Sequence, residues 1–599
     1  MREKKSTIVL FLMVAGCARP PAATPAMPAS TVPGGTPAVA RRPADPPRLV
    51  TPLAGPRVAE VLTAAGDVRD ALVTGNALWL ATAGGLVRAS LELAEEARFT
   101  TLDGLPSNDV RELAALDDEL YLATGAGVVS MRLDGGRLAD LTLLPLAQVR
   151  AVAVSQGALF AGTSNGLWRW DGRQFQPAAL EGQQVNRLIS DGTALWAATS
   201  AGVARIAGGR VSRFTKKDGL PDDFVWDVAL EEGSLQVETM AGPARIEGGA
   251  VKALPGAAKR RIPIPFGDGR LVIGDSGVTR LGPDGAARTS LQPLGLPSPD
   301  VTALAVGDDA LYVGTFDRGV AALRRDRDDG SLSIDPVEGL IDERINALAV
   351  RRDGAVEELW VGTARGASRV RAGQITHYTE ADGLPDDHVN AILADADAVR
   401  LVTTRGYAEI TAGGLKRVMA ENGLPMTRLY AAARTADGAL WLGGAHGAAR
   451  LGCERAACDT PSWSTARALS GELPDDYVTA LLTTGDDLWV GTYSSGLARR
   501  SGRRWSSLRE PDLPSGWINA GALASWHGRV WAGTVERGLL VSPPQRPGED
   551  EGRWTTLGIA DGLPSADVTA FAADDDGLWV GTRGGLARVV MPVVVGGLR

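Results

Sequence analysis

The sequence is poor in the side chains from which metal sites and redox centres are most often built. Its 599 residues include three cysteines and four histidines, which is too few for zinc clusters. We therefore expect no metal and no cofactor. Basic residues are also in deficit, because 62 Lys and Arg face 71 Asp and Glu for a net charge of −9. A nucleic-acid-binding domain is normally basic, so we expect no nucleic-acid partner.

Long apolar segments are scarce as well. Residues 7–16 are apolar but too short to span a bilayer, and no other segment is apolar over 18 residues. A charged stretch precedes this apolar segment, and the segment ends in Val14-Ala15-Gly16-Cys17. This order resembles a bacterial lipoprotein signal over residues 1–17, which implies lipid on Cys17 and a membrane as partner. An ordinary secretory signal with an accidental cysteine is the alternative.

The residues after this signal indicate where the protein would stand. Residue 18 is Ala rather than Asp, and by analogy with lipoproteins this favours the outer membrane, on its periplasmic or surface side. Residues 18–56 are rich in Pro, Ala and Thr. Such a composition cannot bury a core and predicts a disordered, extended tether between the membrane and the folded part.

Glycine, in contrast, is abundant at 74 residues, and a repeated motif explains much of this number. Leu-Trp-Val-Gly-Thr occurs three times without change, in residues 359–363, 488–492 and 578–582. Degenerate copies recur every 36 to 48 residues. The residue at the Trp position marks thirteen copies: Trp79, Tyr121, Phe160, Trp196, Gln236, Val272, Tyr312, Trp360, Arg400, Trp441, Trp489, Trp531 and Trp579.

Each copy predicts four short strands, which we term A to D. The motif is strand B, apolar runs flank it without helical period, and turn residues recur every eight to twelve positions. Four strands at a period of about 40 residues are typical of a β-propeller blade. Strand B would be buried between neighbouring blades, with the large ring as core and the glycine allowing close approach of backbones.

A second motif precedes strand A in many units. It reads Asp-Gly-Leu-Pro and ends at a valine, as in residues 103–110, 218–225, 382–389 and 561–568. The two motifs together resemble the two-component regulator propeller repeat found in periplasmic sensor regions of hybrid two-component systems. The resemblance implies two propellers and a sensing role. Because the chain ends shortly after the last repeat, at residues 593–599, we expect no kinase and no transmembrane part.

The marker positions predict an all-β fold of two β-propellers in tandem. One closed ring of thirteen blades is improbable because propellers have four to eight. Counting back from the end assigns residues 294–599 to a second ring of seven blades. Residues 57–293 then form a first ring of six or seven. Residues 57–62 resemble a D strand that stands before the first A strand, so we expect them to close a ring by strand exchange.

Candidate binding residues follow the Gly-Thr of each strand B, in the B–C loops. These loops are small in the first ring but polar and aromatic in the second. Arginines and aromatics that converge on one axis suit a carboxylate, phosphate or glycan ligand. Solvated turn residues are the alternative. The candidates are Phe316, Asp317, Arg318, Arg365, Arg405, Tyr407, His446, Tyr493, Glu536, Arg537 and Arg583.

Three acidic pairs invite an enzymatic interpretation, at residues 222–223, 386–387 and 475–476. They share one repeat position, and Pro-Asp turns are ordinary local structure in which Asp bonds its own backbone. A bound cation is a further option. We therefore expect no catalytic residue. Cys453 and Cys458, in an exported protein, predict a disulfide, since a metal site would need more ligands.

Together these features predict a non-enzymatic envelope lipoprotein whose propellers bind a glycan-type ligand or a partner protein. The resemblance supports a sensor module without its kinase. Two alternatives remain open at this point: a scaffold or assembly lipoprotein of envelope biogenesis, and a propeller lyase or glycosidase.

Overall fold

The computed structural model describes residues 55–592, apart from residues 134–140, 232, 258–261, 453–460 and 545–552. The expected signal, the lipidation site at Cys17, nearly all of the tether and the Cys453–Cys458 pair lie outside the described residues. Within the described part of the chain, no helix has the length and apolar character needed to cross a membrane.

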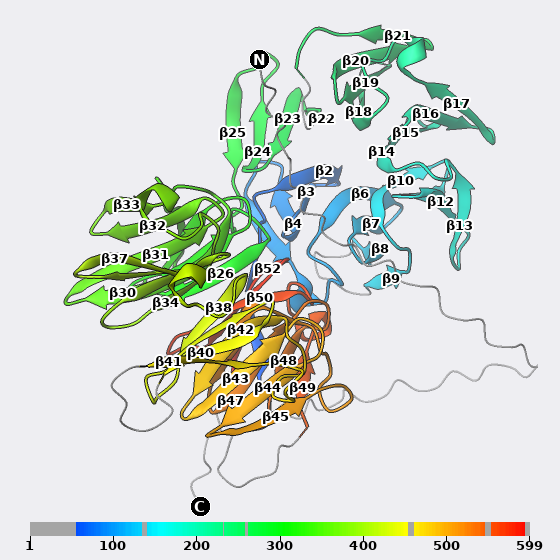
Figure 1. The fold of residues 1–599 in the computed structure, drawn as a ribbon. Helices are drawn as coiled ribbons and strands as arrows, with labels where there is room; N and C mark the ends of the chain where they lie inside the picture. The colour runs from blue at the N-terminus through cyan, green and yellow to red at the C-terminus, as the bar shows by residue number, and fades with distance from the viewer. Residues whose placement is uncertain are drawn as a thin grey trace, which may run out of the picture. The chain divides into compact units, whose positions relative to one another are not determined.

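The described residues form thirteen four-stranded antiparallel sheets (Figure 1). Every marker position of the sequence lies on the second strand of a sheet, the weak copies Gln236, Val272 and Arg400 included. The expected all-β fold of propeller blades is therefore confirmed. Most markers are also core residues: Trp360, Trp489 and Trp531 are at most 1% exposed.

Six sheets built from consecutive strands make up the first ring. Their strands are β2 (Val68–Thr74), β3 (Ala77–Thr82), β4 (Gly85–Ser90) and β5 (Glu95–Phe99); β6 (Val110–Leu116), β7 (Glu119–Thr124), β8 (Gly127–Arg132) and β9 (Thr142–Leu144); β10 (Val149–Ser155), β11 (Ala158–Thr163), β12 (Gly166–Trp170) and β13 (Phe175–Ala179); β14 (Val185–Ser190), β15 (Leu195–Thr199), β16 (Gly202–Ala207) and β17 (Arg210–Phe214); β18 (Val225–Glu231), β19 (Ser234–Thr239), β20 (Gly242–Glu247) and β21 (Ala250–Ala253); β22 (Ile264–Phe266), β23 (Gly269–Gly274), β24 (Gly277–Leu281) and β25 (Ala287–Leu291).

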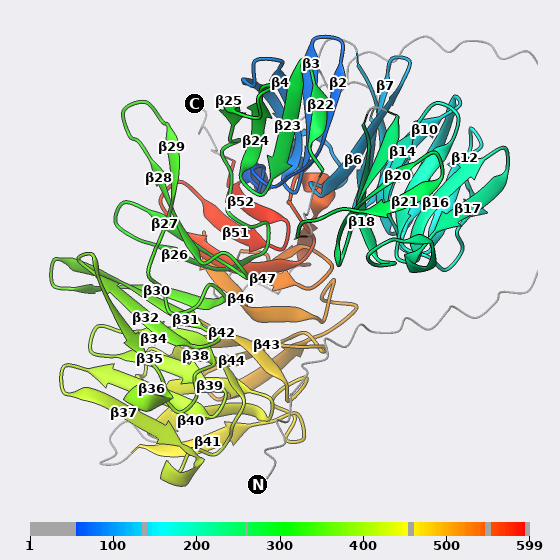
Figure 2. The same cartoon turned by 90° about the horizontal axis from the view of Figure 1, so that it is seen from above.

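Seven sheets make up the second ring (Figure 2). Their strands are β26 (Val301–Val306), β27 (Leu311–Thr315), β28 (Val320–Arg325) and β29 (Leu332–Pro336); β30 (Ile345–Asp353), β31 (Val356–Thr363), β32 (Gly366–Arg371) and β33 (Gln374–Tyr378); β34 (Val389–Ala394), β35 (Val399–Thr403), β36 (Gly406–Thr411) and β37 (Gly414–Met419); β38 (Leu429–Arg434), β39 (Leu440–Gly444), β40 (Gly447–Gly452) and β41 (Ser462–Ala466); β42 (Val478–Thr484), β43 (Asp487–Thr492), β44 (Leu497–Ser501) and β45 (Arg504–Leu508); β46 (Ile518–Trp526), β47 (Arg529–Thr534), β48 (Leu539–Val541) and β49 (Thr555–Leu557); β50 (Val568–Ala573), β51 (Leu578–Thr582), β52 (Gly585–Val590) and β1 (Arg57–Leu62).

The expected strand exchange is present, and it closes the second ring. β1 pairs antiparallel with β52, with Leu62 opposite Leu586. The sequence assigns residues 57–62 to the first ring because they precede its first A strand; that boundary is wrong, since β1 belongs to the sheet of β50–β52. β52 is the last strand that its own blade can supply, so its outer edge is open until β1 covers it.

The second ring is closed along its inner strands. β26, β30, β34, β38, β42, β46 and β50 contact one another in that order, and β50 contacts β26. In the first ring, β2, β6, β10, β14 and β18 follow in series, and β23 contacts β2.

Apolar clusters fill the spaces between neighbouring blades. One example joins Trp489 to Ile518 and Val530 of the next blade. Among the described residues, the junction between the β18–β21 and β22–β25 sheets has no such cluster. Polar contacts join these two sheets instead: the Ile262 amide donates to Asp227 at 2.9 Å, and Arg270 pairs with Glu231.

Short 3₁₀ turns precede several A strands and explain the Asp-Gly-Leu-Pro motif. In the turn at residues 101–103, the Thr100 and Asp103 side chains cap each other's backbone, and Gly104 ends the turn at φ 99°. A residue with a Cβ rarely adopts this φ, so glycine is required there. In the part of the chain that the structure describes, these turns are η1 (Thr101–Asp103), η2 (Lys216–Asp218), η3 (Glu380–Asp382), η4 (Ala420–Asn422) and η5 (Ile559–Asp561).

Candidate functional site

The D–A and B–C loops of each blade emerge together on one face, which we call the loop face. The first residue of a B–C loop donates its amide to the carbonyl of the residue just before strand A. In the blade of β42–β45 this bond joins Tyr493 to Tyr477 at 2.9 Å, and in the last blade it joins Arg583 to Asp567 at 3.1 Å. Residues directly before an A strand therefore lie next to the B–C loop.

Ten of the eleven predicted binding residues are exposed on this face of the second ring: Phe316, Asp317, Arg318, Arg365, Arg405, His446, Tyr493, Glu536, Arg537 and Arg583. Tyr407 differs, because it is 4% exposed and packs with Leu424 and Leu442 of the next blade. Strand β36 has already begun at Gly406, so the Tyr407 side chain belongs to the strand and is buried between blades.

Several of the arginines are held by carboxylates on the same face. Arg583 contacts Asp300 at 2.8 Å and Asp567 at 3.1 Å. Burial raises the pKa of Asp300, while the charge of Arg583 acts in the opposite direction. Arg318 pairs with Asp275 at 2.8 Å. These ion pairs reduce the positive charge that the loop face can offer to an anionic ligand.

Four aromatic side chains form a continuous stripe over three neighbouring blades, which we call the aromatic track. Tyr430 stacks on Tyr477 with ring centroids 5.2 Å apart, Tyr477 lies 5.5 Å from Tyr493, and Tyr493 stacks on Trp517 at 6.0 Å. Tyr477, Tyr493 and Trp517 are 39%, 49% and 47% exposed. Exposed aromatic rings gathered in one stripe make the aromatic track a candidate interaction site.

The backbone of the loops fixes these rings. Tyr430 is the bulged residue of β38, between Leu429 and Ala431. Tyr477 directly precedes β42 and Trp517 directly precedes β46. Burial raises the pKa of the Tyr477 hydroxyl, and its hydrogen bond to Tyr430 acts in the same direction. Strand position and ring-to-ring contacts therefore both constrain the aromatic track.

Tyr493 was the one member of the aromatic track that the sequence identified. The B–C loops do not include Tyr430, Tyr477 and Trp517, which lie at the starts of A strands. The signal that finds them is the position just before, or one residue into, an A strand. The other blades of the second ring mostly carry charged or small polar residues at the first of these positions, among them Arg344, His388 and Asp567.

The acidic pairs are turn residues, as predicted. The first Asp accepts the amide two residues later: Asp222 from Phe224 at 2.8 Å, and Asp386 from His388 at 2.8 Å. The second Asp accepts an amide of the preceding turn, as Asp387 does from Glu380 at 2.6 Å. These carboxylates thus support the loop that carries the aromatic and charged residues.

A buried ion cluster occupies the inner strands of the first ring. Arg187 contacts Asp70 at 2.6 Å, Glu112 at 3.0 Å and Asp227 at 3.5 Å, from four different blades. Burial raises the pKa of Glu112 to about 8, against the opposing charge of Arg187, and the negative charge of Asp70 acts in the same direction as burial. The second ring has alanine in the same register, for example Ala303 and Ala570. The inner strands of the two rings therefore differ in charge.

A family model described as two component regulator propeller matches residues 562–584. The match covers most of both sequence motifs of the last blade, and several other blades repeat one or both of them. The last blade therefore matches the two component regulator propeller repeat. No curated protein matches this chain.

Solved structures resemble this chain at low identity. An ancestral GH74 enzyme is 11% identical with a TM-score of 0.65, covering 92% of this chain and 100% of that one. The extracellular domain of a putative hybrid two component system from B. thetaiotaomicron is 16% identical with a TM-score of 0.41, covering 87% and 75%. PorZ, a surface component of the type-IX secretion system of Porphyromonas gingivalis, is 12% identical with a TM-score of 0.47, covering 88% and 86%. At these identities the likeness concerns the fold.

Proposed function

We propose that this chain is a non-enzymatic, extracytoplasmic binding module, and that the loop face of its second ring holds a glycan. The observation that carries the proposal is the aromatic track of Tyr430, Tyr477, Tyr493 and Trp517. Sugar rings present flat C–H faces that pack on aromatic rings, and Tyr and Trp offer a polar atom beside an apolar face.

The length of the track favours a glycan chain over a single small molecule. Its rings follow one another at centroid distances of 5.2 to 6.0 Å across three blades, so several sugar units can lie along it. Polar groups border it: Asp475 accepts from Ser494 at 2.9 Å, and Arg428 is exposed directly before β38. Such groups can bond the hydroxyls of a sugar whose face rests on the rings.

Isothermal titration calorimetry with a panel of soluble polysaccharides tests this proposal. We expect Tyr493→Ala and Trp517→Ala to weaken binding at least tenfold. Trp226→Ala is the matched control, because Trp226 is a comparably exposed Trp, at 40%, in the first ring, and we expect binding unchanged. Absence of binding to every polysaccharide, or an equal loss in the control variant, would overturn the glycan ligand.

The same variants separate the glycan from the two other functions. A stable protein partner that co-purifies from solubilised membranes and survives Trp517→Ala, without any polysaccharide binding, would favour a scaffold. Shortened products in the titrated polysaccharide would favour an enzyme. Metabolic labelling with a radioactive fatty acid tests the envelope anchor, and we expect Cys17→Ala to abolish the label.

A further inference from the structure

Two neighbouring arginines stand at the Tyr430 end of the aromatic track. Arg428 directly precedes β38, two residues before Tyr430, and its amide donates to the Thr404 carbonyl at 2.6 Å. Arg405 follows Thr404 in the B–C loop of the neighbouring blade. Both arginines are exposed. The backbone bond between their loops therefore brings them side by side, and we call Arg405 and Arg428 the arginine pair.

The charge of Arg428 reaches the aromatic track. Burial raises the pKa of the Tyr477 hydroxyl, whereas the charge of Arg428 acts in the opposite direction. A charge changes a pKa in this way only when it lies close to the group. On the other side, the Ala445 amide donates to the Arg428 carbonyl at 3.1 Å, so the loop that carries the exposed His446 is adjacent as well. The Tyr430 end of the track thus has basic surroundings.

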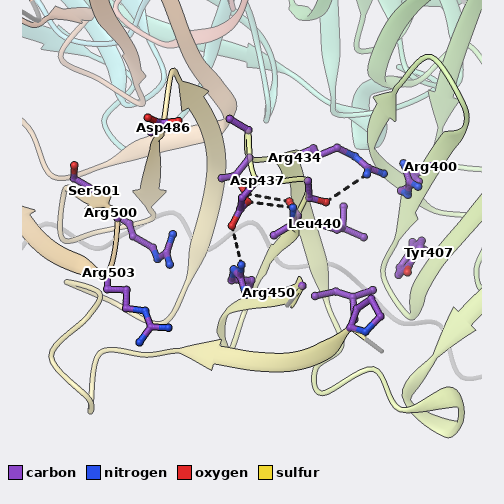
Figure 3. Close-up of a pocket in the computed structure, with 18 of the residues that line it drawn as sticks. Arg400, Tyr407, Arg434, Asp437, Leu440, Arg450, Asp486, Arg500, Ser501 and Arg503 are labelled. Atoms are coloured by element: carbon purple, nitrogen blue, oxygen red, sulfur yellow. Dashed lines mark hydrogen bonds and ion pairs between the residues drawn. The ribbon is translucent and has the colours of Figure 1, made fainter. Parts of the chain in front are cut away.

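Many other arginines of the second ring are accompanied by carboxylates. Figure 3 shows one such case in a cavity at the end of the blades opposite to the loop face, where Arg450 contacts Asp437 at 2.8 Å. On the loop face itself, Arg344 contacts Asp342 at 3.0 Å. Among the residues that the structure describes, neither member of the arginine pair has such a partner. Its charge is therefore available to a ligand.

The carboxylates nearest to the track in sequence are engaged in their own loop. Asp475 accepts the Tyr477 amide at 3.1 Å and the Ser494 hydroxyl at 2.9 Å. Asp476 accepts the Ala468 amide at 2.7 Å. These bonds hold the loop that presents Tyr477 and leave the arginine pair without a counter-charge.

We propose that the glycan on the aromatic track is acidic, and that the arginine pair binds the carboxylate of a uronic acid unit. This inference rests on the proposed function. A uronic acid carries its carboxylate at the edge of the sugar ring, so a unit stacked on Tyr430 or Tyr477 can direct it to Arg428. The planar guanidinium matches a carboxylate with two parallel hydrogen bonds. A neutral glycan would leave both charges without a partner.

Calorimetric titration with matched polymers tests the charge of the ligand. The acidic probes are polygalacturonate and alginate, and methyl-esterified polygalacturonate is the neutral match with the same backbone. We expect an acidic polymer to bind at least tenfold more tightly than the ester, and added NaCl to weaken the acidic polymer alone. Equal affinity for acid and ester would overturn the acidic ligand but leave the glycan proposal standing. Absence of binding to every polysaccharide, neutral or acidic, would overturn both.

Three variants locate the carboxylate. Arg405→Gln and Arg428→Gln should each weaken binding of the acidic polymer at least tenfold and change the affinity for the ester less than twofold. Arg417→Gln is the matched control, because Arg417 is exposed on β37, the outer strand of the same blade as Arg405, and binding should be unchanged. An undiminished affinity in Arg428→Gln, or an equal loss for acid and ester, would overturn the role of the arginine pair.

Discussion

The hydroxyl of Thr569 donates a hydrogen bond of 2.6 Å to the carbonyl of Val301, which precedes it by 268 residues. This bond joins the last blade of the second ring to the first. Bulged residues of other A strands form the same bond to the next blade, such as Asn390 to Leu429 at 2.7 Å. Between β38 and β42 the bulged residue is Tyr430, which stacks on Tyr477 instead. The aromatic track therefore lies where a ring of hydrogen bonds is interrupted.

Replacing Thr569 by Val tests the contribution of this ring of bonds. The variant keeps the shape of the side chain but leaves the Val301 carbonyl without its donor, so the free energy of unfolding should fall by about 1 kcal/mol. Urea denaturation followed by Trp fluorescence measures it. Thr376→Val, at an exposed position of β33, is the control and should match the wild type. Equal stability of both variants would contradict the prediction.

The exchanged strand β1 offers a second test. Val58 is 6% exposed in a cluster with Trp531 and Val589. Val58→Asp would bury a charge there and should destabilise the second ring by about 3 kcal/mol. Arg57 is exposed on the same strand, so Arg57→Asp should have little effect. Limited proteolysis with mass spectrometry should locate new cleavage sites in the second ring. Cleavage confined to the first ring would refute this role of β1.

The glycine of the Leu-Trp-Val-Gly-Thr motif is expected to be intolerant of a methyl group. A Cβ at Gly491 would lie 2.8 Å from Ile518 Cγ2 of the next blade. Gly491→Ala should therefore lower the free energy of unfolding by about 1 to 3 kcal/mol through overpacking, and Ile518→Ala in the same chain should recover part of the packing strain. A Cβ at Gly558 meets nothing within 4 Å, so Gly558→Ala is the control. Thermal denaturation compares the three variants.

The ion cluster of the first ring predicts a pH dependence. Burial raises the pKa of Glu112 to about 8 from an ordinary value of 4.5. The folded state thus holds this proton more tightly than the unfolded state, so the contribution of Glu112 to stability is lost as pH rises from about 4.5 to 8. Glu112→Gln removes this titration and should gain stability relative to the wild type over that range. Urea denaturation at pH 5, 6, 7 and 8 measures the difference, and a constant difference would contradict the raised pKa.

The sequence predicted the blades well because their strongest signal is local. Trp489 and its equivalents stand at the same position of each repeat, so each copy carries the evidence for its own strand even though the ring packs on the next blade. The sequence predicted that residues 57–62 close a ring but not which strand they pair with. These residues have the pattern of a strand, and nothing in that pattern specifies β52. That pairing is decided by which sheet edge is open in the folded chain.

The site was harder to predict because it is assembled from different loops. Tyr493 was found in a B–C loop, but Tyr477 and Trp517 become its neighbours through the backbone bonds of the loop face. Tyr407 was expected beside a B–C loop, but it is the second residue of β36. Its side chain is therefore buried between two blades and is not exposed on the loop face.

The place of β1 in the chain sets an order of assembly. All strands of the first ring, β2 to β25, have been synthesised once residue 291 has left the ribosome, whereas the second ring must wait for β52 at residues 585–590. Strand β1, made before either ring, stays unpaired throughout that interval. Co-translational folding should therefore finish the inner, inserted propeller first, and leave a free N-terminal strand that a chaperone can hold until the last blade arrives.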